Sequence, residues 1–211
     1  MKTDDLIDAL AAGLQPAPPA RLNAPLLACA AAASVAAVAI LLGIRPALAE
    51  SLSYPALWMK GLYTAALAGA ALWLSARAGR PGADTRLPLA VLAAIVALAV
   101  LWGAAELLLA PASERLPDWL GRTWTICGRN ILLVSAAAAV PTFLSARRLA
   151  PTRPAFSGFA LGMATGGIAA TAYGVLHCPE STVAFVATWY TLGVAAAGLI
   201  GAVAGRFALR W

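Results

Sequence analysis

The side chains with the most reactive chemistry in this chain are concentrated near one short stretch, LHCPES, at residues 176–181. It contains His177, the only histidine, and Cys178, one of three cysteines. A second cysteine, Cys127, lies in the stretch GRTWTICGRN at residues 121–130. Thiolates are nucleophiles, redox-active groups and ligands for soft metal ions. The two cysteines are therefore candidates for chemistry if the fold brings them together.

The composition indicates that a membrane surrounds these residues. Of the 211 residues, 62% are hydrophobic and only 11% are charged, whereas a soluble domain carries about a quarter charged residues. The net charge of +6 does not indicate nucleic-acid binding, because the arginines flank apolar runs and form no basic face. We predict a protein of the lipid bilayer with no direct contact to nucleic acid.

Six apolar stretches are long enough to cross the hydrocarbon core as helices, which takes roughly 20 residues each. No long soluble domain separates them, and the alternating pattern of a β-barrel is absent. The sequence predicts an all-α, six-helix transmembrane bundle over residues 23–211, preceded by a cytoplasmic amphipathic segment and proline-rich linker at 1–22. The predicted spans are 24–43, 56–76, 88–109, 124–144, 156–176 and 183–204.

The positions of lysine and arginine predict the orientation, because these residues are more frequent on the cytoplasmic side. With both termini inside, ten of them lie on the inner side and five on the outer side. The inner set is Lys2, Arg21, Arg77, Arg80, Arg86, Arg147, Arg148, Arg153, Arg206 and Arg210. The outer set is Arg45, Lys60, Arg115, Arg122 and Arg129.

In this orientation Cys127 and Cys178 share one depth, near the outer, oxidising surface. Glu106 lies about 18 residues beyond the inner start of its span, or roughly 27 Å at 1.5 Å per residue, and so reaches the same level. Three chemistries remain open: a structural disulfide, a reversible redox pair, or a soft-metal site of two thiolates completed by His177 and Glu106. In the plainest interpretation, the histidine is solvated and the cysteines form an ordinary disulfide.

No enzyme motif accompanies these residues. The sequence has no CxxC or HExxH pattern, no Ser/His/Asp arrangement and no phosphate-binding loop. We therefore predict that the protein is not an enzyme and requires no cofactor.

A row of small residues in the fifth predicted span indicates close helix packing. Gly158, Gly162 and Gly166 recur every four residues and form a flat stripe on one helix face. Such stripes allow two helix backbones to approach closely in lipid. The partner helix can belong to the same chain or to a second copy, so a homo-oligomer is compatible with the sequence.

The N-terminal segment has a different character. Thr3 can cap a short helix whose first turn is acidic. Its apolar face comprises Leu6, Ile7, Leu10 and Leu14, and its acidic residues are Asp4, Asp5 and Asp8. A membrane-binding helix usually carries lysines on its polar face, so this helix favours a protein partner with a basic surface. The alternative is an interfacial helix that only begins the bundle.

Several of these features together resemble one known family. They are the string MKTDDLIDALA with its proline-rich linker, the six spans, GRN beside Cys127, and HCPES followed by WYTLG. The chain resembles, over essentially its whole length, the negative regulator of sigma-F (NrsF-like) family. These are membrane anti-sigma factors of proteobacteria that restrain an extracytoplasmic-function sigma factor.

The resemblance implies a role for each end of the molecule. In a bacterial inner membrane, the tail would hold the sigma factor through its acidic and apolar residues. Cys127 and Cys178 match the family's outward cysteine pair and would carry a stress signal linked to heavy metals, with an ion bound transiently. The tail has only about 22 residues, so the inner loops at 77–87 and 145–155 are candidates for further contacts.

Two other classes of protein compete with this interpretation. A small transporter or metal-permeation protein needs a polar path across several spans, but the predicted midplanes are almost entirely Ala, Leu, Val and Gly. A purely structural scaffold explains the bundle but leaves the acidic tail without a purpose.

Overall fold

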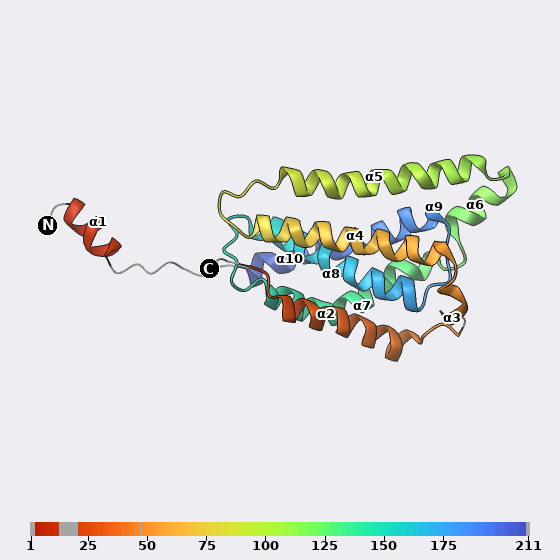
Figure 1. Cartoon of the computed structure of the whole chain (residues 1–211), viewed down its shortest axis with the longest axis horizontal. Helices are drawn as coiled ribbons and strands as arrows, with labels where there is room; N and C mark the ends of the chain where they lie inside the picture. The colour runs from red at the N-terminus through yellow and green to blue at the C-terminus, as the bar shows by residue number, and fades with distance from the viewer. Residues whose placement is uncertain (1–2, 13–20, 47, 210–211) are drawn as a thin grey trace.

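The computed structural model describes residues 3–12, 21–46 and 48–209, and over these ranges it contains helices and no strand. The all-α prediction is thus confirmed for the described residues. The helices are α1 (Thr3–Ala11), α2 (Ala24–Ala37), α3 (Leu48–Ser51), α4 (Pro55–Ala78), α5 (Arg86–Leu109), α6 (Ala112–Leu120), α7 (Trp124–Ser145), α8 (Pro154–Leu176), α9 (Val183–Phe185) and α10 (Thr191–Ala208) (Figure 1). Two π-helical segments, η1 (Val38–Leu42) and η2 (Val186–Tyr190), continue α2 and join α9 to α10.

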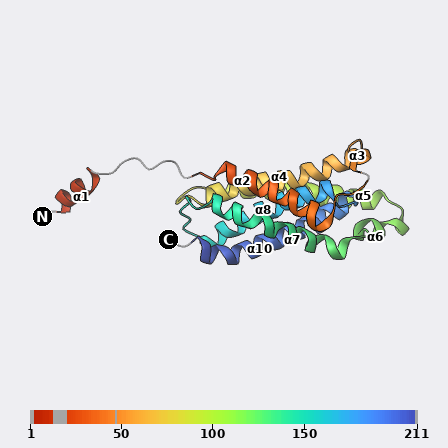
Figure 2. The same ribbon diagram turned by 90° about the horizontal axis from the view of Figure 1, so that it is seen from below.

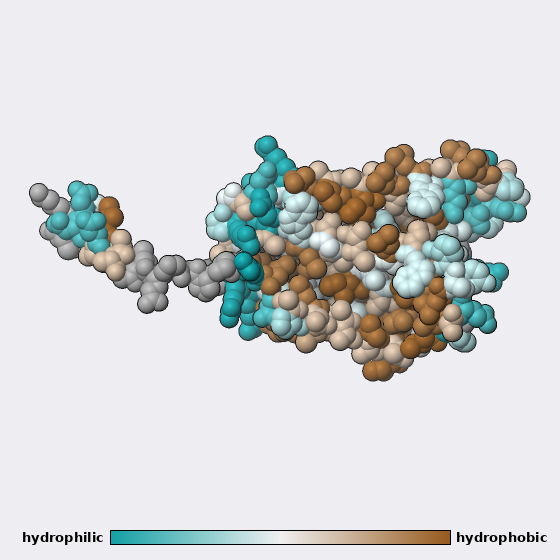
Figure 3. Space-filling view, viewed as in Figure 1, coloured by the Kyte–Doolittle hydropathy of each residue, from teal (hydrophilic) through white to brown (hydrophobic). Residues whose placement is uncertain are grey.

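Helical stretches of membrane-spanning length and hydropathy occur five times in the described part of the chain. They are Ala24–Leu42, Arg86–Leu109, Ala112–Ser145, Pro154–Leu176 and Val183–Ala208. The second predicted span corresponds to α4, which has 24 residues but is more polar because it contains Lys60, Thr64 and Arg77. That α4 also crosses the membrane, as a sixth span, therefore stays a prediction. Figure 3 shows hydrophobic residues over the middle of the visible face and hydrophilic residues at both ends of the bundle.

Prolines and one polar cap define where several of the long helices begin. Pro25, Pro55 and Pro154 each occupy the first turn of a helix. The N–H groups of this turn have no partner within the helix, so proline, which lacks an N–H group, costs no hydrogen bond there. At the start of α2 the Asn23 side chain also accepts a hydrogen bond from the Leu26 N–H group, at 3.2 Å. The local sequence thus fixes these helix starts independently of the membrane.

Helix α8 forms the centre of the bundle. It contacts α2, α4, α7 and α10, and most of its side chains are buried (Figures 1 and 2). By contrast, α5 lies at the edge and buries few of its side chains. Movement at either end of α8 would therefore change its contacts with several other helices.

The predicted glycine stripe of α8 lies against α10 of the same chain. A Cβ atom added at Gly158 would overlap the Gly201 carbonyl oxygen, and one at Gly162 would overlap the Ala197 carbonyl oxygen. At Gly166 an added Cβ would lie 2.9 Å from the Ala197 Cβ. The two backbones thus approach closely, and this contact supplies dispersion energy where lipid offers no hydrophobic drive.

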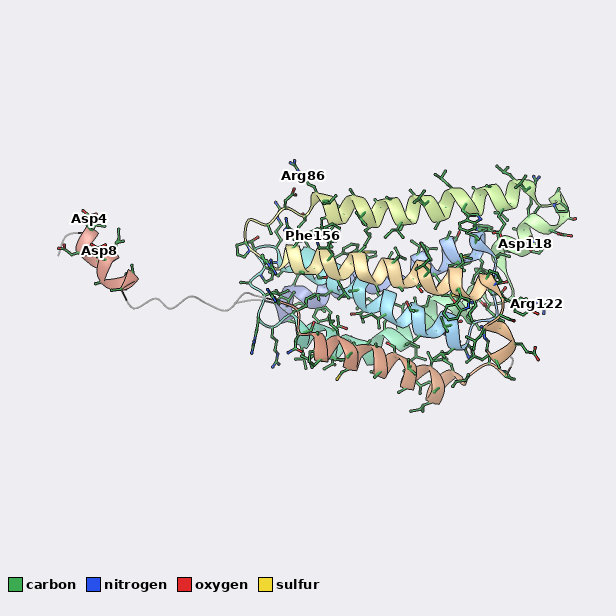
Figure 4. All side chains as sticks on the ribbon, in the orientation of Figure 1. Asp4, Asp8, Arg86, Asp118, Arg122 and Phe156 are labelled. Atoms are coloured by element: carbon green, nitrogen blue, oxygen red, sulfur yellow. The ribbon has the colours of Figure 1, made fainter. Side chains whose placement is uncertain are left out.

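The two ends of the bundle carry different parts of the chain. The tail end holds the start of α2, the loops 79–85 and 146–153, and the end of α10, whereas the far end holds α3, α6 and the loop 177–182. In Figure 4, Arg86 and Phe156 mark the tail end, and Asp118 and Arg122 mark the far end. The sequence did not predict α3 or α6, because both are too short and polar to stand out as spans.

Candidate functional site

The fold brings Cys127 and Cys178 together at the far end. Cys127 lies in the first turn of α7, where its N–H group bonds the Thr123 carbonyl oxygen at 2.9 Å. Cys178 lies two residues after the end of α8, and its N–H group bonds the Tyr173 carbonyl oxygen at 3.0 Å. Both side chains are fully buried, both are free thiols, and they hydrogen-bond to each other. The structure therefore contains a reduced thiol pair and no bond between the two sulfurs.

Lys60 is a buried, charged residue beside the thiol pair. It belongs to α4, and only 1% of its surface is exposed. Its ammonium group donates hydrogen bonds to the carbonyl oxygens of Cys178 at 2.8 Å and Glu180 at 2.7 Å. Lysine is almost never fully buried without such partners. Lys60 thus anchors the loop 177–182 and places a positive charge beside Cys178.

The surroundings favour the thiolate form of Cys178. The hydrogen bond from the Cys127 thiol, followed by the positive charge of Lys60, lowers the pKa of Cys178 from its ordinary value of 9.0 to about 5, although burial acts in the opposite direction. These contacts favour a thiolate on Cys178, with the Cys127 thiol as its hydrogen-bond donor. This state combines a nucleophile and a soft ligand in one buried site.

Aromatic side chains enclose the pair. The Tyr173 ring stacks on His177 with 5.5 Å between ring centroids and packs against Tyr190 at 6.0 Å. Phe185 meets Tyr190 edge-on at 6.3 Å. The Tyr190 hydroxyl is buried next to the Cys178 sulfur. Sequence reasoning missed both tyrosines, although Tyr173 precedes Cys178 by little more than one helical turn.

His177 and Glu106 lie at the expected level but make other contacts. The Nδ1 atom of His177 lies 2.8 Å from the Gly43 carbonyl oxygen, and Glu106 accepts a hydrogen bond from the Ala184 N–H group at 2.9 Å. Within the ranges that the structure describes, no three His, Cys, Asp or Glu side chains are placed to hold a metal ion. Binding of a soft ion by the two thiolates alone stays a prediction.

Glu180 links the two cysteine-bearing segments, and sequence reasoning missed it. Its carboxylate accepts hydrogen bonds from the Arg122 N–H group at 2.8 Å and the Thr123 hydroxyl at 3.4 Å. Those residues immediately precede α7, which begins three residues before Cys127. The sequence feature that could have identified Glu180 is its position two residues after Cys178. Glu180 thus fixes the loop of Cys178 to the start of the helix of Cys127.

At the opposite extreme of the molecule, α1 exposes its apolar face. Leu6, Ile7 and Leu10 are 42%, 57% and 67% exposed, and no residue of α1 is buried. Asp4 and Asp5 occupy the first turn, as predicted. Figure 4 shows Asp4 and Asp8 on α1, away from the bundle. The predicted linker at 13–20, with Leu14, lies outside the described residues.

Comparison with known proteins agrees with the resemblance seen in the sequence. The family model described as "Negative regulator of sigma F" (NrsF) matches residues 10–211. The anti-sigma-F factor NrsF of Caulobacter vibrioides is 40% identical over 219 residues, and the probable anti-sigma-F factor NrsF of Azospira oryzae is 35% identical over 217, each alignment covering 100% of both chains. No solved structure matches the chain. With a matching family model and full-length relatives, the chain belongs to the NrsF family of negative regulators of sigma F.

Proposed function

We propose that this protein is an anti-sigma factor that holds an extracytoplasmic-function sigma factor at the inner membrane and releases it when the outer thiol pair reacts. The exposed acidic, amphipathic helix α1 is the observation that carries the sigma-binding part. An amphipathic helix binds a partner by placing its apolar face in a groove. Its aspartates complement the basic surfaces with which sigma factors meet DNA.

The proposal includes six spans with both termini in the cytoplasm. An even number of spans is supported by the packing of Leu22, before α2, and Leu209, after α10, in one cluster with Ala146 and Leu149. At 1.5 Å per residue, the 24 residues of α4 extend for about 36 Å, enough to cross the hydrocarbon core. The described arginines at the tail end also support this orientation; they are Arg21, Arg77, Arg80, Arg86, Arg147, Arg148, Arg153 and Arg206.

The inner loops offer a second surface for the sigma factor. A hollow of about 320 Å³ lies between the loop after α4 and the start of α8. Three arginines line it, Arg80, Arg86 and Arg153, together with Asp84 and Phe156. We propose that this surface supplements α1, because a helix of 9 residues buries little area by itself.

The signal enters at Cys127 and Cys178 in one of two ways. In the redox route, the Cys178 thiolate and the Cys127 thiol form a disulfide, releasing one proton and passing two electrons to a two-electron oxidant. In the metal route, Cys127 loses its proton and both thiolates bind one heavy-metal ion. The lowered pKa of Cys178 supports both routes, because each needs a thiolate.

Either reaction would act on the helices through contacts already present. Cys178 is continuous with α8, Cys127 belongs to α7, and Lys60 connects α4 to the same loop. A switch requires that the signal favour one arrangement of these helices over another. We propose that the reacted pair changes the packing of α7 against α8, and that this change reaches the tail end.

A promoter reporter tests the proposal. In cells carrying a reporter under the sigma factor's promoter, replacing both Cys127 and Cys178 with serine should abolish induction by a heavy-metal salt. Cys29→Ser is the matched control, because Cys29 is exposed on α2 and distant in sequence from the pair. Unchanged induction in the double variant would remove the sensing role from the two thiols.

A further inference from the structure

A polar pocket lies beside the thiol loop and shares Lys60 with the thiol site. It has a volume of about 190 Å³ and lies between the loop after η1, the α3–α4 turn and the loop 177–182. A water molecule occupies about 30 Å³ of liquid, so the pocket holds several waters or one small polyatomic ion. The polar and loop residues lining it are Arg45, Ser51, Tyr54, Lys60, Pro179 and Ser181.

The lining carries two positive charges and no carboxylate. Arg45 and Lys60 point to the same acceptor, the Cys178 carbonyl oxygen, with the Arg45 Nη1 at 3.3 Å and the Lys60 Nζ at 2.8 Å. The nearby Glu180 carboxylate is bonded instead to the Arg122 N–H group and the Thr123 hydroxyl. Two like charges converging on one neutral oxygen repel each other, and an anion between them would relieve this repulsion.

The guanidinium of Arg45 has an unused pair of donors. Its Nε and Nη2 atoms are buried and have no hydrogen-bond partner within the described part of the chain. Buried donors are nearly always bonded, so this pair requires an explanation. The N–H groups on Nε and Nη2 lie parallel on one edge of the guanidinium, the geometry that binds two oxygens of one oxyanion.

The Arg45 side chain is held by the bond from its Nη1 atom to the Cys178 carbonyl oxygen, and its backbone is held as well. The Arg45 N–H group bonds the Leu176 carbonyl oxygen at 3.0 Å, which ties this loop to the end of α8. The His177 ring bonds the adjacent Gly43 carbonyl oxygen. The backbone that carries the donor pair is thus tied to the end of α8.

We infer that this pocket binds a small oxyanion of the phosphate or sulfate type, with two of its oxygens on Arg45 Nε and Nη2 and its charge balanced further by Lys60. The Ser181 hydroxyl lies at the pocket and can donate to a third oxygen. The same chemistry is offered by a free ion and by the phosphate of a lipid headgroup. The site involves no residue of α1, and it shares Lys60 with the thiol pair.

Calorimetric titration of the full-length chain in an uncharged, phospholipid-free detergent tests the site. Sodium sulfate and sodium phosphate are titrated in one arm, a short-chain phosphatidylglycerol in the other, with sodium chloride at equal ionic strength as reference. Saturable binding in either arm is expected, and the arm that saturates identifies the source of the oxyanion. No saturable binding in either arm would overturn the proposal.

Two variants locate the site. Arg45→Lys keeps the charge but removes the parallel donors, and we expect it to weaken binding by at least about tenfold. Ser181→Asp adds a carboxylate at an exposed position of the lining and should also weaken binding. The matched controls are Arg115→Lys and Ser113→Asp, on the exposed surface of α6 at the same end. Equal affinity in Ser181→Asp and the wild type would contradict the assignment even if Arg45→Lys did not fold.

Discussion

The ammonium group of Lys60 lies 2.8 Å from the carbonyl oxygen of Cys178, although 118 residues separate them in the sequence. This contact joins α4 to the loop that carries the reactive thiol, and Lys60 also bonds the Glu180 carbonyl oxygen. It combines two effects in one side chain, because it positions the loop and stabilises negative charge on sulfur. Through this contact α4 forms part of the site.

Lys60→Met should destabilise the protein by about 1–3 kcal/mol, since the Glu180 carbonyl oxygen loses its partner and the Cys178 carbonyl oxygen keeps only the longer bond from Arg45. Methionine keeps the length and apolar stem of lysine, so the change isolates the ammonium group. Unfolding in detergent, followed by circular dichroism, measures the effect. The exposed Arg148→Met serves as control and should stay within about 0.5 kcal/mol of the wild type. A small effect at Lys60 would mean that other groups hold the loop.

Cys178 should make stability depend on pH. Its pKa is lowered from 9.0 to about 5 in the folded protein, so between these values the unfolded chain binds more protons than the native one. Stability from this group therefore increases from about pH 5 to pH 9 and is lost as the pH falls through 5. Cys178→Ser should remove that pH-dependent part, whereas Cys29→Ser should leave it intact. Melting temperatures measured from pH 5 to pH 8 check the slope, and parallel curves for wild type and Cys178→Ser would refute the ionised thiol.

Cys127→Ala should raise the pKa of Cys178, because the hydrogen bond from the Cys127 thiol is the largest cause of its lowering. The ultraviolet absorbance of the thiolate, titrated in the Cys29→Ser background, reports this ionisation directly. The Cys178→Ser protein gives the baseline. If the titration midpoint were the same with and without Cys127, the two thiols would not interact as the structure shows.

Gly162→Ala should weaken the packing of α8 on α10, because the added Cβ atom would overlap the Ala197 carbonyl oxygen. Overpacking of this kind costs about 1–3 kcal/mol. Gly69→Ala is the matched control, since a Cβ atom there meets nothing within 4 Å. Gly162→Ala should therefore lower the free energy of unfolding relative to the wild type, whereas Gly69→Ala should lower it much less or raise it. Equal values would show that the bundle accommodates the extra atom without cost.

Ile7→Asp should abolish capture of the sigma factor without affecting the bundle, because Ile7 is 57% exposed on α1. Affinity capture from solubilised membranes, together with a melting curve, separates binding from folding. Ala11→Ser, at the end of the same helix, should retain the partner. If the Ile7→Asp protein still captured the sigma factor, the main contact would lie in the inner loops and not in α1.

The sequence was sufficient to predict helices at all six apolar stretches, because hydrophobic length is a local signal. It also placed Lys60, Glu106 and the two cysteines at one level by counting residues along straight helices. It could not predict that His177 would bond Gly43, or that Glu180 would bond the start of α7, since both contacts join segments far apart in sequence. The unpartnered donors of Arg45 likewise arise only when three loops meet.

The most direct test of the central claim measures release of the sigma factor at one end after reaction at the other. The sigma factor is first captured with the full-length chain from native membranes, and the complex is reconstituted in lipid. A thiol-binding heavy-metal ion, Cd²⁺, is then added to the wild type and to the Cys127→Ser/Cys178→Ser protein. The account predicts that the wild type releases its partner and that the double variant retains it. Equal release from both proteins, or none from either, would contradict it.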